Sequence, residues 1–168
     1  VLNLDNEITR SFLDETRDDT YGFSRNSTVE KGAYCSDGKI YMNKKFVMNT
    51  NEIKIPGNHN IENYLAAICA VWGDVSAENI ALVAREFGGV PHRAELVREL
   101  DGVKYYNDSI ASSPSRAMSG TLSLYDKKII MIAGGADKKV PFDELGEVIC
   151  KKVKTLILVK PEKQLEGF

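Results

Sequence analysis

The sequence has few of the features that mark redox, metal-binding or membrane proteins. Its three cysteines, Cys35, Cys69 and Cys150, are far apart and form no CxxC pair, so neither a zinc site nor a redox motif is indicated. No apolar run approaches the roughly 20 residues needed to cross a bilayer, and the chain does not start with a basic segment followed by an apolar stretch. We therefore expect reduced cysteines that pack in the interior, a cytoplasmic setting and no membrane partner.

An excess of one charge is also absent. The 22 basic and 24 acidic residues are interspersed and give a formal net charge of −2, so no basic face indicates nucleic acid. Small molecules are the expected partners of what we predict to be a monomer. With 43% apolar residues, the 168-residue chain is able to bury one good core or two small ones.

Neither of the common glycine-rich phosphate-binding motifs occurs, because the sequence contains no GxGxxG and no GxxxxGKS/T. The phosphates of any bound nucleotide must therefore be held by other residues. The chain begins with an apolar, strand-like run from Val1 to Leu4, without an initiator methionine or a polar lead-in. We interpret this start as a cut within a longer protein.

The first half of the chain predicts a small sheet followed by two helices. Short β-prone runs surround residues 36–39, whose Asp-Gly pair favours a hairpin turn. A helical apolar stripe follows over residues 60–72. Ser76 is placed to cap a second helix, which ends at Gly88-Gly89, and we place a domain boundary there. The residues of this second helix that we expect to face inward are Ile80, Val83, Ala84 and Phe87.

The second half predicts an α/β arrangement. Runs at 93–100 and 103–106 flank Asp101-Gly102, a strong hairpin signal. Ser113 is expected to cap a helix that has Pro114 in its first position and continues to Tyr125. The remaining predicted elements are a buried strand at 128–133, a helix at 142–150 and a buried strand at 155–159. Strands that alternate with helices predict a mostly parallel sheet, incomplete within this chain.

Two asparagines at the start of the first helix form the first candidate site. Asn60 and Asn63 lie three residues apart, so both amides project from one face. Each amide offers a donor and an acceptor, which matches the N6/N7 edge of adenine, and Gly57 permits close approach of a ligand. The simpler alternative is that Asn58 or Asn60 only caps the helix.

His92 and Arg93 lie at the predicted domain boundary, where ligand clefts often form. The planar guanidinium of Arg93 is suited to phosphate, and His92 is able to hydrogen-bond a ribose or to order the linker. The alternative for Arg93 is an ordinary ion pair with a surface acid.

Asp108 comes directly after a predicted strand, at the edge where open α/β sheets bind ligands. A carboxylate there suits the paired hydroxyls of a ribose. The alternative is an Asx-turn in which Asn107 or Asp108 ties down its own loop. Ser112 and Ser113 offer hydroxyls to an anion at a helix start, although capping alone explains one of them.

Lys138 and Lys139 follow the Gly134-Gly135 turn at the end of a predicted strand. Either ammonium group is able to bind a substrate carboxylate as a point charge. A solvated pair of surface lysines is the alternative.

Taken together, these segments resemble the Mur ligases. The resemblance rests on Gly57-x-His59-Asn60-x-x-Asn63-x-x-Ala66-Ala67, on residues 87–93 followed by Glu95, on Asn107-Asp108-Ser109 and on Gly134-Gly135. The Asn-Asp-Ser-x-Ala-Ser form is more similar to the members that add D-glutamate than to those that add L-alanine, diaminopimelate, lysine or the D-alanyl dipeptide.

The resemblance implies an ATP-dependent amide-bond ligase of peptidoglycan synthesis with a UDP-sugar domain, a central ATPase domain and a Rossmann-like C-terminal domain. Residues 1–89 would form the end of the central domain and residues 90–168 part of the C-terminal domain. Such ligases use ATP and Mg²⁺ to phosphorylate the carboxylate of UDP-N-acetylmuramoyl-L-alanine, and D-glutamate attacks the acyl phosphate. The P-loop and the magnesium ligands would precede Val1, so we expect no turnover from this chain alone.

The resemblance also implies roles for single residues. Asn60 and Asn63 would lie at the adenine, His92 and Asp108 at the ribose, Arg93 near the terminal phosphates, and Ser112 and Lys138 at the carboxylates of D-glutamate. One departure is Ile110, which stands where many members have a lysine. Two other functions remain open: a folylpolyglutamate synthase of the same superfamily, and a nucleotide-binding module without catalysis.

Overall fold

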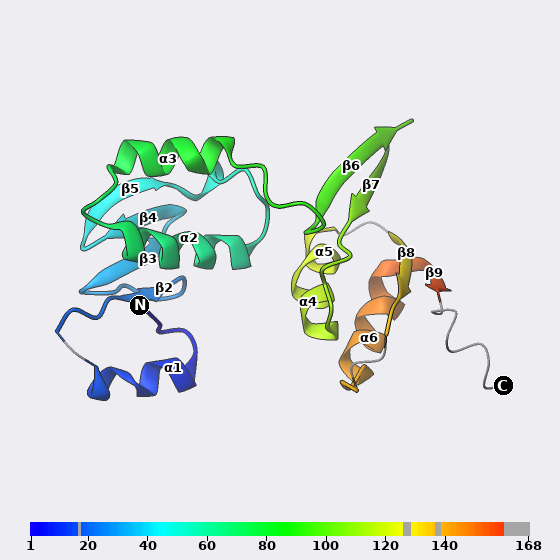
Figure 1. Ribbon diagram of the computed structural model, residues 1–168, viewed down its shortest axis with the longest axis horizontal. Helices are drawn as coiled ribbons and strands as arrows, with labels where there is room; N and C mark the ends of the chain where they lie inside the picture. Colours follow the sequence, from blue (N-terminus) through cyan, green and yellow to red (C-terminus); the bar gives the residue numbers. More distant parts are fainter. Residues whose placement is uncertain (17, 126–128, 137–138, 160–168) are drawn as a thin grey trace. The chain divides into compact units, whose positions relative to one another are not determined.

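The computed structural model describes residues 1–16, 18–125, 129–136 and 139–159. The chain divides into two compact units, Val1–Gly88 and Gly89–Phe168. Figure 1 shows the elements of each unit. This division lies beside the boundary that we expected at Gly88-Gly89, and the two units are described separately below.

The first unit is built on a five-stranded mixed sheet in the order β1-β2-β3-β4-β5. β1, β2 and β3 run parallel, whereas β4 and β5 continue the sheet in antiparallel fashion. The strands are β1 (Leu2–Asn3), β2 (Gly22–Ser24), β3 (Gly32–Ser36), β4 (Lys39–Met42) and β5 (Lys45–Asn49). The short helices are α1 (Glu7–Ser11), η1 (Leu13–Glu15) and η2 (Thr50–Glu52).

The predicted hairpin between β3 and β4 is confirmed. Ser36 pairs with Lys39, and Asp37 and Gly38 have φ angles of 48° and 71°. Two consecutive positive φ angles are typical of the turn whose twist matches an antiparallel pair.

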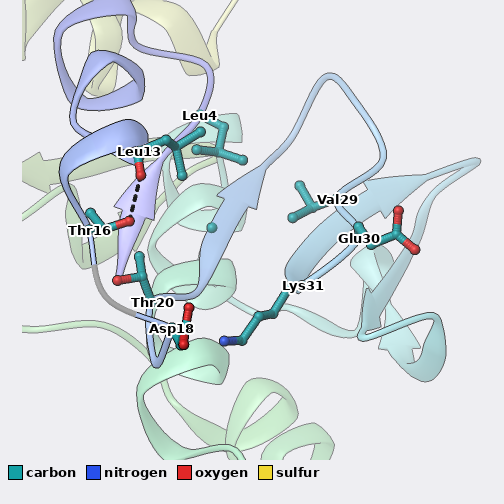
Figure 2. Close-up of a pocket in the computed structure, with 9 residues that line it drawn as sticks. Leu4, Leu13, Thr16, Asp18, Thr20, Val29, Glu30 and Lys31 are labelled. Atoms are coloured by element: carbon teal, nitrogen blue, oxygen red, sulfur yellow. Dashed lines mark hydrogen bonds between the residues drawn. The ribbon is translucent and has the colours of Figure 1, made fainter.

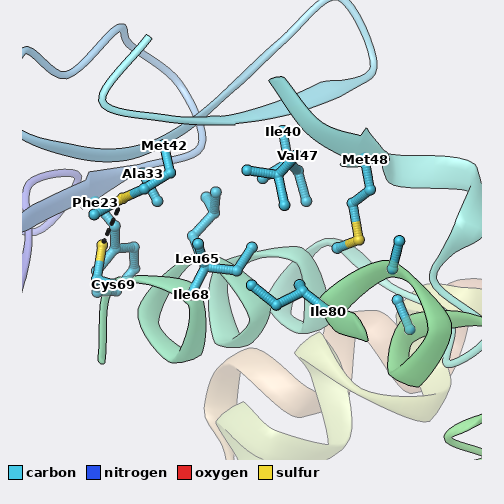
Figure 3. Packing of buried hydrophobic residues seen from close by; sticks show 12 residues of the cluster. Phe23, Ala33, Ile40, Met42, Val47, Met48, Leu65, Ile68, Cys69 and Ile80 are labelled. Atoms are coloured by element: carbon cyan, nitrogen blue, oxygen red, sulfur yellow. Dashed lines mark hydrogen bonds between the residues drawn. The ribbon is translucent and has the colours of Figure 1, made fainter. Parts of the chain in front are cut away.

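Two helices cover one face of this sheet: α2 (Asn58–Val71), which contacts β2 and β3, and α3 (Ala77–Glu86), which contacts β5. Figure 3 shows the apolar residues that fill the space between helices and strands. This core comprises Phe23, Ala33, Ile40, Met42, Val47 and Met48 from the sheet and Leu65, Ile68, Cys69, Ile80, Ala81 and Ala84 from the helices.

The expected inward face of α3 is partly wrong. Ile80 and Ala84 are buried as expected, together with Ala81, but Val83 and Phe87 are 55% and 42% exposed. The buried stripe follows the spacing i, i+1, i+4, which turns Val83 to the outside of the helix. Ser76 caps α3 as predicted, because its hydroxyl accepts a hydrogen bond from the backbone N–H of Asn79.

The second unit begins with the predicted hairpin, β6 (Glu95–Leu100) and β7 (Val103–Asn107). The single helix expected from Ser113 to Tyr125 is wrong, because it is divided into α4 (Pro114–Ser119) and α5 (Thr121–Leu124). Gly120 separates them with φ −86° and ψ −120°, and an added Cβ at this glycine would lie 2.6 Å from the carbonyl oxygen of Arg116. The backbone therefore leaves the helical path where glycine alone fits.

The last elements are β8 (Ile129–Gly134), α6 (Asp143–Lys152) and β9 (Val153–Val159), and the two strands pair in parallel as predicted. Their expected burial is wrong: Ile130, Ile132 and Leu158 are 64%, 70% and 75% exposed. Parallel strands are usually covered on both faces, but among the described residues this sheet has two strands. The α/β fold class is confirmed in both units.

Two further findings concern the cysteines and the helices. All three cysteines are free, but only Cys69 is buried; Cys35 is partly buried and Cys150 is exposed, so the expectation of interior packing is wrong for Cys150. Within the described ranges, no helix has both the length and the apolar character needed to cross a membrane.

Candidate functional site

At the start of α2, a short chain of hydrogen bonds joins the two candidate asparagines. Asn63 Nδ2 donates to Asn60 Oδ1 at 3.3 Å, and Asn60 Nδ2 donates to the carbonyl oxygen of Pro56 at 2.7 Å. Asn60 thus stabilises the turn before the helix, while the N-cap position itself is held by Gly57, with φ 105°. Asn63 is exposed and retains a carbonyl oxygen and an N–H with no partner among the described residues, which is the pair of groups that an adenine edge requires.

This helix start lies at the carboxyl edge of the parallel strands of the first unit. Arg25 follows β2, and its Nε lies 3.0 Å from Oε1 of Glu62 in the first turns of α2. Asp5 follows β1 and accepts a hydrogen bond of 2.7 Å from the backbone N–H of Arg25. Open α/β sheets bind ligands at this edge. We did not predict Arg25 or Glu62, and the one available signal was the place of Arg25 directly after a β-prone run.

Next to Asn63, the hydroxyl of Tyr64 is buried and has no hydrogen-bond partner among the residues that the structure describes. Burial raises the pKa of this phenol because the phenolate would lose its hydration. The side chain packs against the core of the first unit. Tyr64 therefore acts as a neutral packing residue against the core of the first unit.

In the second unit, His92 is held by three hydrogen bonds. Its backbone N–H donates to Oε2 of Glu95 at 2.8 Å, and its carbonyl oxygen accepts from the N–H of Ile110 at 3.2 Å. Its ring Nδ1 lies 2.8 Å from Nδ2 of Asn107. The backbone has φ 66°, in the left-handed region, so these contacts maintain a conformation that a residue with a side chain rarely adopts.

Asp108 belongs to the same cluster. Its Oδ1 accepts a hydrogen bond of 3.0 Å from the backbone N–H of Ala94, and its Oδ2 accepts one from the hydroxyl of Thr121. The structure thus brings together His92 and Asp108, the two residues predicted to lie at a ribose. A carboxylate has about four lone-pair positions, so two further donors are able to bind Asp108 while the loop contacts remain.

Sequence reasoning missed the roles of Asn107, Glu95 and Thr121 in this cluster. Thr121 lies within the helix that was predicted to continue to Tyr125, and its residue type gave no sign that its hydroxyl binds Asp108. Asn107 also forms the local turn that we had considered, because its Oδ1 accepts from the backbone N–H of Ser109 at 3.2 Å. The contact of Asn107 with His92 depends on how the strands pair, which residue types alone do not show.

Arg93 and the two serines Ser112 and Ser113 have fewer contacts among the described residues. The exposed side chain of Arg93 has no hydrogen-bond or ion-pair partner within the described ranges, so the alternative of an ordinary ion pair with a surface acid is not observed there. Ser112 is exposed directly before α4, while Ser113 holds the N-cap position and its Oγ lies 3.2 Å from Oγ of Ser115 instead of capping the helix. Lys138 lies outside the described residues.

A separate open pocket of about 430 Å³ lies on the first unit (Figure 2). Leu4, Leu13 and Val29 provide apolar surface, and Glu30 and Lys31 add charges of opposite sign. None of the predicted site residues that the structure describes lines this pocket. In the part of the chain that the structure describes, no group of three or more His, Cys, Asp or Glu side chains is placed to hold a metal ion.

Comparison with known proteins identifies relatives over nearly the whole chain, although no family model matches it. The chain is 51% identical over 165 residues to the UDP-N-acetylmuramoylalanine--D-glutamate ligase of Clostridium acetobutylicum. This match covers 97% of the chain and 36% of the relative. The enzymes of the same name from Acetivibrio thermocellus and Clostridium novyi are 50% and 49% identical over 163 and 158 residues. These matches cover 95% and 94% of the chain, and 35% and 34% of the two relatives.

The chain thus spans about a third of the length of the curated relatives that it matches. About half of its residues are identical to theirs, across both compact units. The resemblance that the motifs indicated is confirmed: nearly the whole chain is similar to about a third of the enzymes named UDP-N-acetylmuramoylalanine--D-glutamate ligase.

Proposed function

We propose that this chain forms part of an ATP-dependent ligase that joins D-glutamate to UDP-N-acetylmuramoyl-L-alanine during peptidoglycan synthesis in the cytoplasm. The observation that carries this proposal is the identity of about 50% to ligases of that name over nearly the whole chain. The same names favour D-glutamate over the folate and L-glutamate of a folylpolyglutamate synthase. We further propose that residues 1–89 belong to the central ATPase domain and residues 90–168 to the C-terminal ligase domain, a boundary one residue from that between the two compact units.

The residues of the first unit fit an adenine. Among the described residues, Asn63 presents an acceptor and a donor without a partner at the carboxyl edge of the parallel strands, and Asn60 orients it through the 3.3 Å hydrogen bond between their amides. Because the other Asn60 contact fixes the turn at Pro56, we assign Asn63 the direct contact with the base and Asn60 a supporting contact.

The residues of the second unit fit the rest of a nucleotide and an acidic amino acid. His92 and Asp108 would bind the ribose, since their cluster combines an imidazole with a carboxylate that still has free lone pairs. Arg93 would meet the terminal phosphates with its exposed guanidinium. Ser112 and Lys138 would bind the two carboxylates of D-glutamate, which need donors in place of the water that they lose.

ATP, when bound, supplies the phosphoryl group that activates the substrate carboxylate. This chain contributes contacts to the nucleoside and positions it, whereas the P-loop and the ligands of Mg²⁺ are proposed to lie in the portion of the relatives that the chain does not match. The absence of GxxxxGKS/T from its sequence is consistent with this division.

The test is the release of inorganic phosphate by the complete protein that carries this chain, with ATP, UDP-N-acetylmuramoyl-L-alanine and D-glutamate. We expect phosphate and amide product only when all three substrates are present, and no product when L-glutamate replaces D-glutamate. Turnover with a folate and L-glutamate would support the synthase instead. Binding of ATP without any turnover would support a non-catalytic nucleotide-binding module.

A further inference from the structure

We propose that Asn107 is a positioning residue that keeps the ring proton of His92 on Nε2. This inference rests on the proposed function, in which His92 binds the ribose of a nucleotide. A neutral imidazole has one donor and one acceptor nitrogen, and the partner of one nitrogen decides the role of the other. Asn107 is the partner of Nδ1, with 2.8 Å between Asn107 Nδ2 and that nitrogen.

The orientation of the Asn107 amide follows from its second contact. Its Oδ1 accepts a hydrogen bond of 3.2 Å from the backbone N–H of Ser109, and an N–H donor requires an oxygen there. The amide nitrogen must therefore face His92. Because this nitrogen has no acceptor capacity, Nδ1 of His92 accepts the hydrogen bond and carries no proton, which leaves the proton on Nε2.

The strand pairing explains why Asn107 reaches His92. Across the hairpin, Leu100 pairs with Val103 and Arg98 with Tyr105, but a bulge between Leu96 and Arg98 shifts the register so that Glu95 faces Asn107. Both members of this pair bind His92: Glu95 binds its backbone N–H and Asn107 binds its ring. The bulge thus brings the side chains of Glu95 and Asn107 into contact with His92 in the preceding turn. Bulges commonly redirect side chains in this way near functional sites.

The consequence for ligand binding concerns the kind of group that His92 offers. With the proton on Nε2, the exposed ring of His92 presents a donor in the same cluster of contacts as Asp108, whose carboxylate is an acceptor. A ribose diol contains two hydroxyls, each able to donate and accept, so this combination suits it. The opposite tautomer would present two acceptors.

The tautomer is measured directly by long-range ¹H–¹⁵N NMR of the chain with ¹⁵N-labelled histidine, at alkaline pH where imidazole is neutral. The sequence contains two histidines, His59 and His92, so a His92→Gln variant assigns the signals and His59 serves as an internal reference for folding. We expect the Nε2–H pattern for His92 in the wild-type chain. A mixture of tautomers, or the Nδ1–H pattern, would overturn the inference.

The diagnostic variant is Asn107→Asp, which keeps the shape and the acceptor for Ser109 but replaces the donor that faces His92 with a carboxylate oxygen. We expect His92 to switch to the Nδ1–H pattern, since a carboxylate accepts a hydrogen bond. A carboxylate also favours the imidazolium, so spectra are recorded at increasing pH until the signals stop changing. Asn107→Ala removes the partner, and we expect both tautomers to be populated. A folded variant of either kind that retains the wild-type pattern contradicts the proposal.

A second readout separates this inference from the proposed function. In the complete protein we expect Asn107→Asp to raise the KM for ATP several-fold, and His92→Ala to raise it at least as much. If the tautomer of His92 changes in the Asn107 variants but His92→Ala leaves the KM for ATP unchanged, the positioning role of Asn107 stands and the assignment of His92 to the ribose fails. If His92→Ala raises the KM and the tautomer does not respond to residue 107, the ribose assignment stands and the positioning role fails.

Discussion

Asp108 and Thr121 are joined by a hydrogen bond from the threonine hydroxyl to the carboxylate Oδ2, while Oδ1 of Asp108 accepts from the backbone N–H of Ala94. One carboxylate thus connects the end of β7, the turn after His92 and the start of α5. The residue proposed to bind ribose is therefore also a structural contact within its own unit. Variants at this site must separate the two roles.

We expect Thr121→Val to destabilise the second unit by about 1 to 2 kcal/mol. A hydrogen bond to a charged group contributes about 1.5 to 3 kcal/mol when it is well shielded, and this one is only partly buried. Thr121→Ser keeps the hydroxyl and is the matched control. Urea unfolding followed by far-UV circular dichroism provides the comparison, and equal stability of the valine and serine variants would exclude a stabilising role for this bond.

Leu65→Ala should destabilise the first unit by about 2 to 5 kcal/mol, the usual cost of a cavity left by a large core residue. Leu65 is 0% exposed in the core that Figure 3 shows. Leu82→Ala is the control, because Leu82 is 45% exposed on α3, and we expect a much smaller loss. Trp72, the single tryptophan, lies in the first unit, so its fluorescence during urea unfolding follows both variants.

Glu52 should make the first unit sensitive to acid. The backbone N–H of Asn49 donates to its carboxylate at 2.7 Å, and this bond, the Asn49 side chain and Arg85 hold the pKa of Glu52 below its ordinary value of 4.5. The pKa of Glu52 is lower in the folded protein than in the unfolded chain, so its ionised carboxylate stabilises the folded state. This stabilisation is complete above about pH 4.5 and disappears as the pH falls through the pKa of the folded state.

The control for this acid effect is Glu52→Gln, which retains an acceptor for Asn49 but carries no charge. We expect the stability of the wild type, followed by Trp72 fluorescence, to fall more steeply than that of the variant as the pH is lowered below about 4.5. Parallel losses in the two proteins would show that Glu52 does not contribute to the acid response.

Lys138→Ala in the complete protein should weaken D-glutamate binding by about 2 kcal/mol while the KM for ATP stays nearly constant, because a carboxylate in the site would lose its cation. Lys139→Ala is the comparison. If Lys139→Ala impairs D-glutamate binding and Lys138→Ala does not, the wrong lysine has been assigned. If neither variant has an effect, the pair is a solvated surface feature.

The elements that the sequence predicted well depend on local rules. The Asp-Gly turns at 37–38 and 101–102, the Ser76 cap and the apolar stripe of α2 each follow from residues within one or two turns of chain. The division of the helix at Gly120 was missed because a single glycine also occurs within continuous helices, where it lowers stability without ending them.

The candidate site was predictable as a set of residues but not as a set of contacts. A two-residue turn alone would place Asn107 opposite Leu96, and the bulge moves it to Glu95. Bulges depend on pairing across strands. The hydrogen bonds of Glu95 and Asn107 to His92, and that of Thr121 to Asp108, therefore could not be inferred from the spacing of residues. The exposure of Ile130 and Ile132 likewise depends on the elements that cover the strand. An apolar run in the sequence does not identify those elements.

The central claim is that this chain carries the nucleoside contacts of a D-glutamate ligase, and its most direct test is the pair of KM values of Asp108→Asn in the complete protein. Asparagine preserves the acceptor for Ala94 and a polar group opposite Thr121 but removes the charge. Loss of a charge-assisted hydrogen bond of about 1.5 to 3 kcal/mol predicts a KM for ATP raised by about 10- to 150-fold, with the KM for D-glutamate unchanged. An unchanged KM for ATP, or an equal rise for both substrates, would contradict the account.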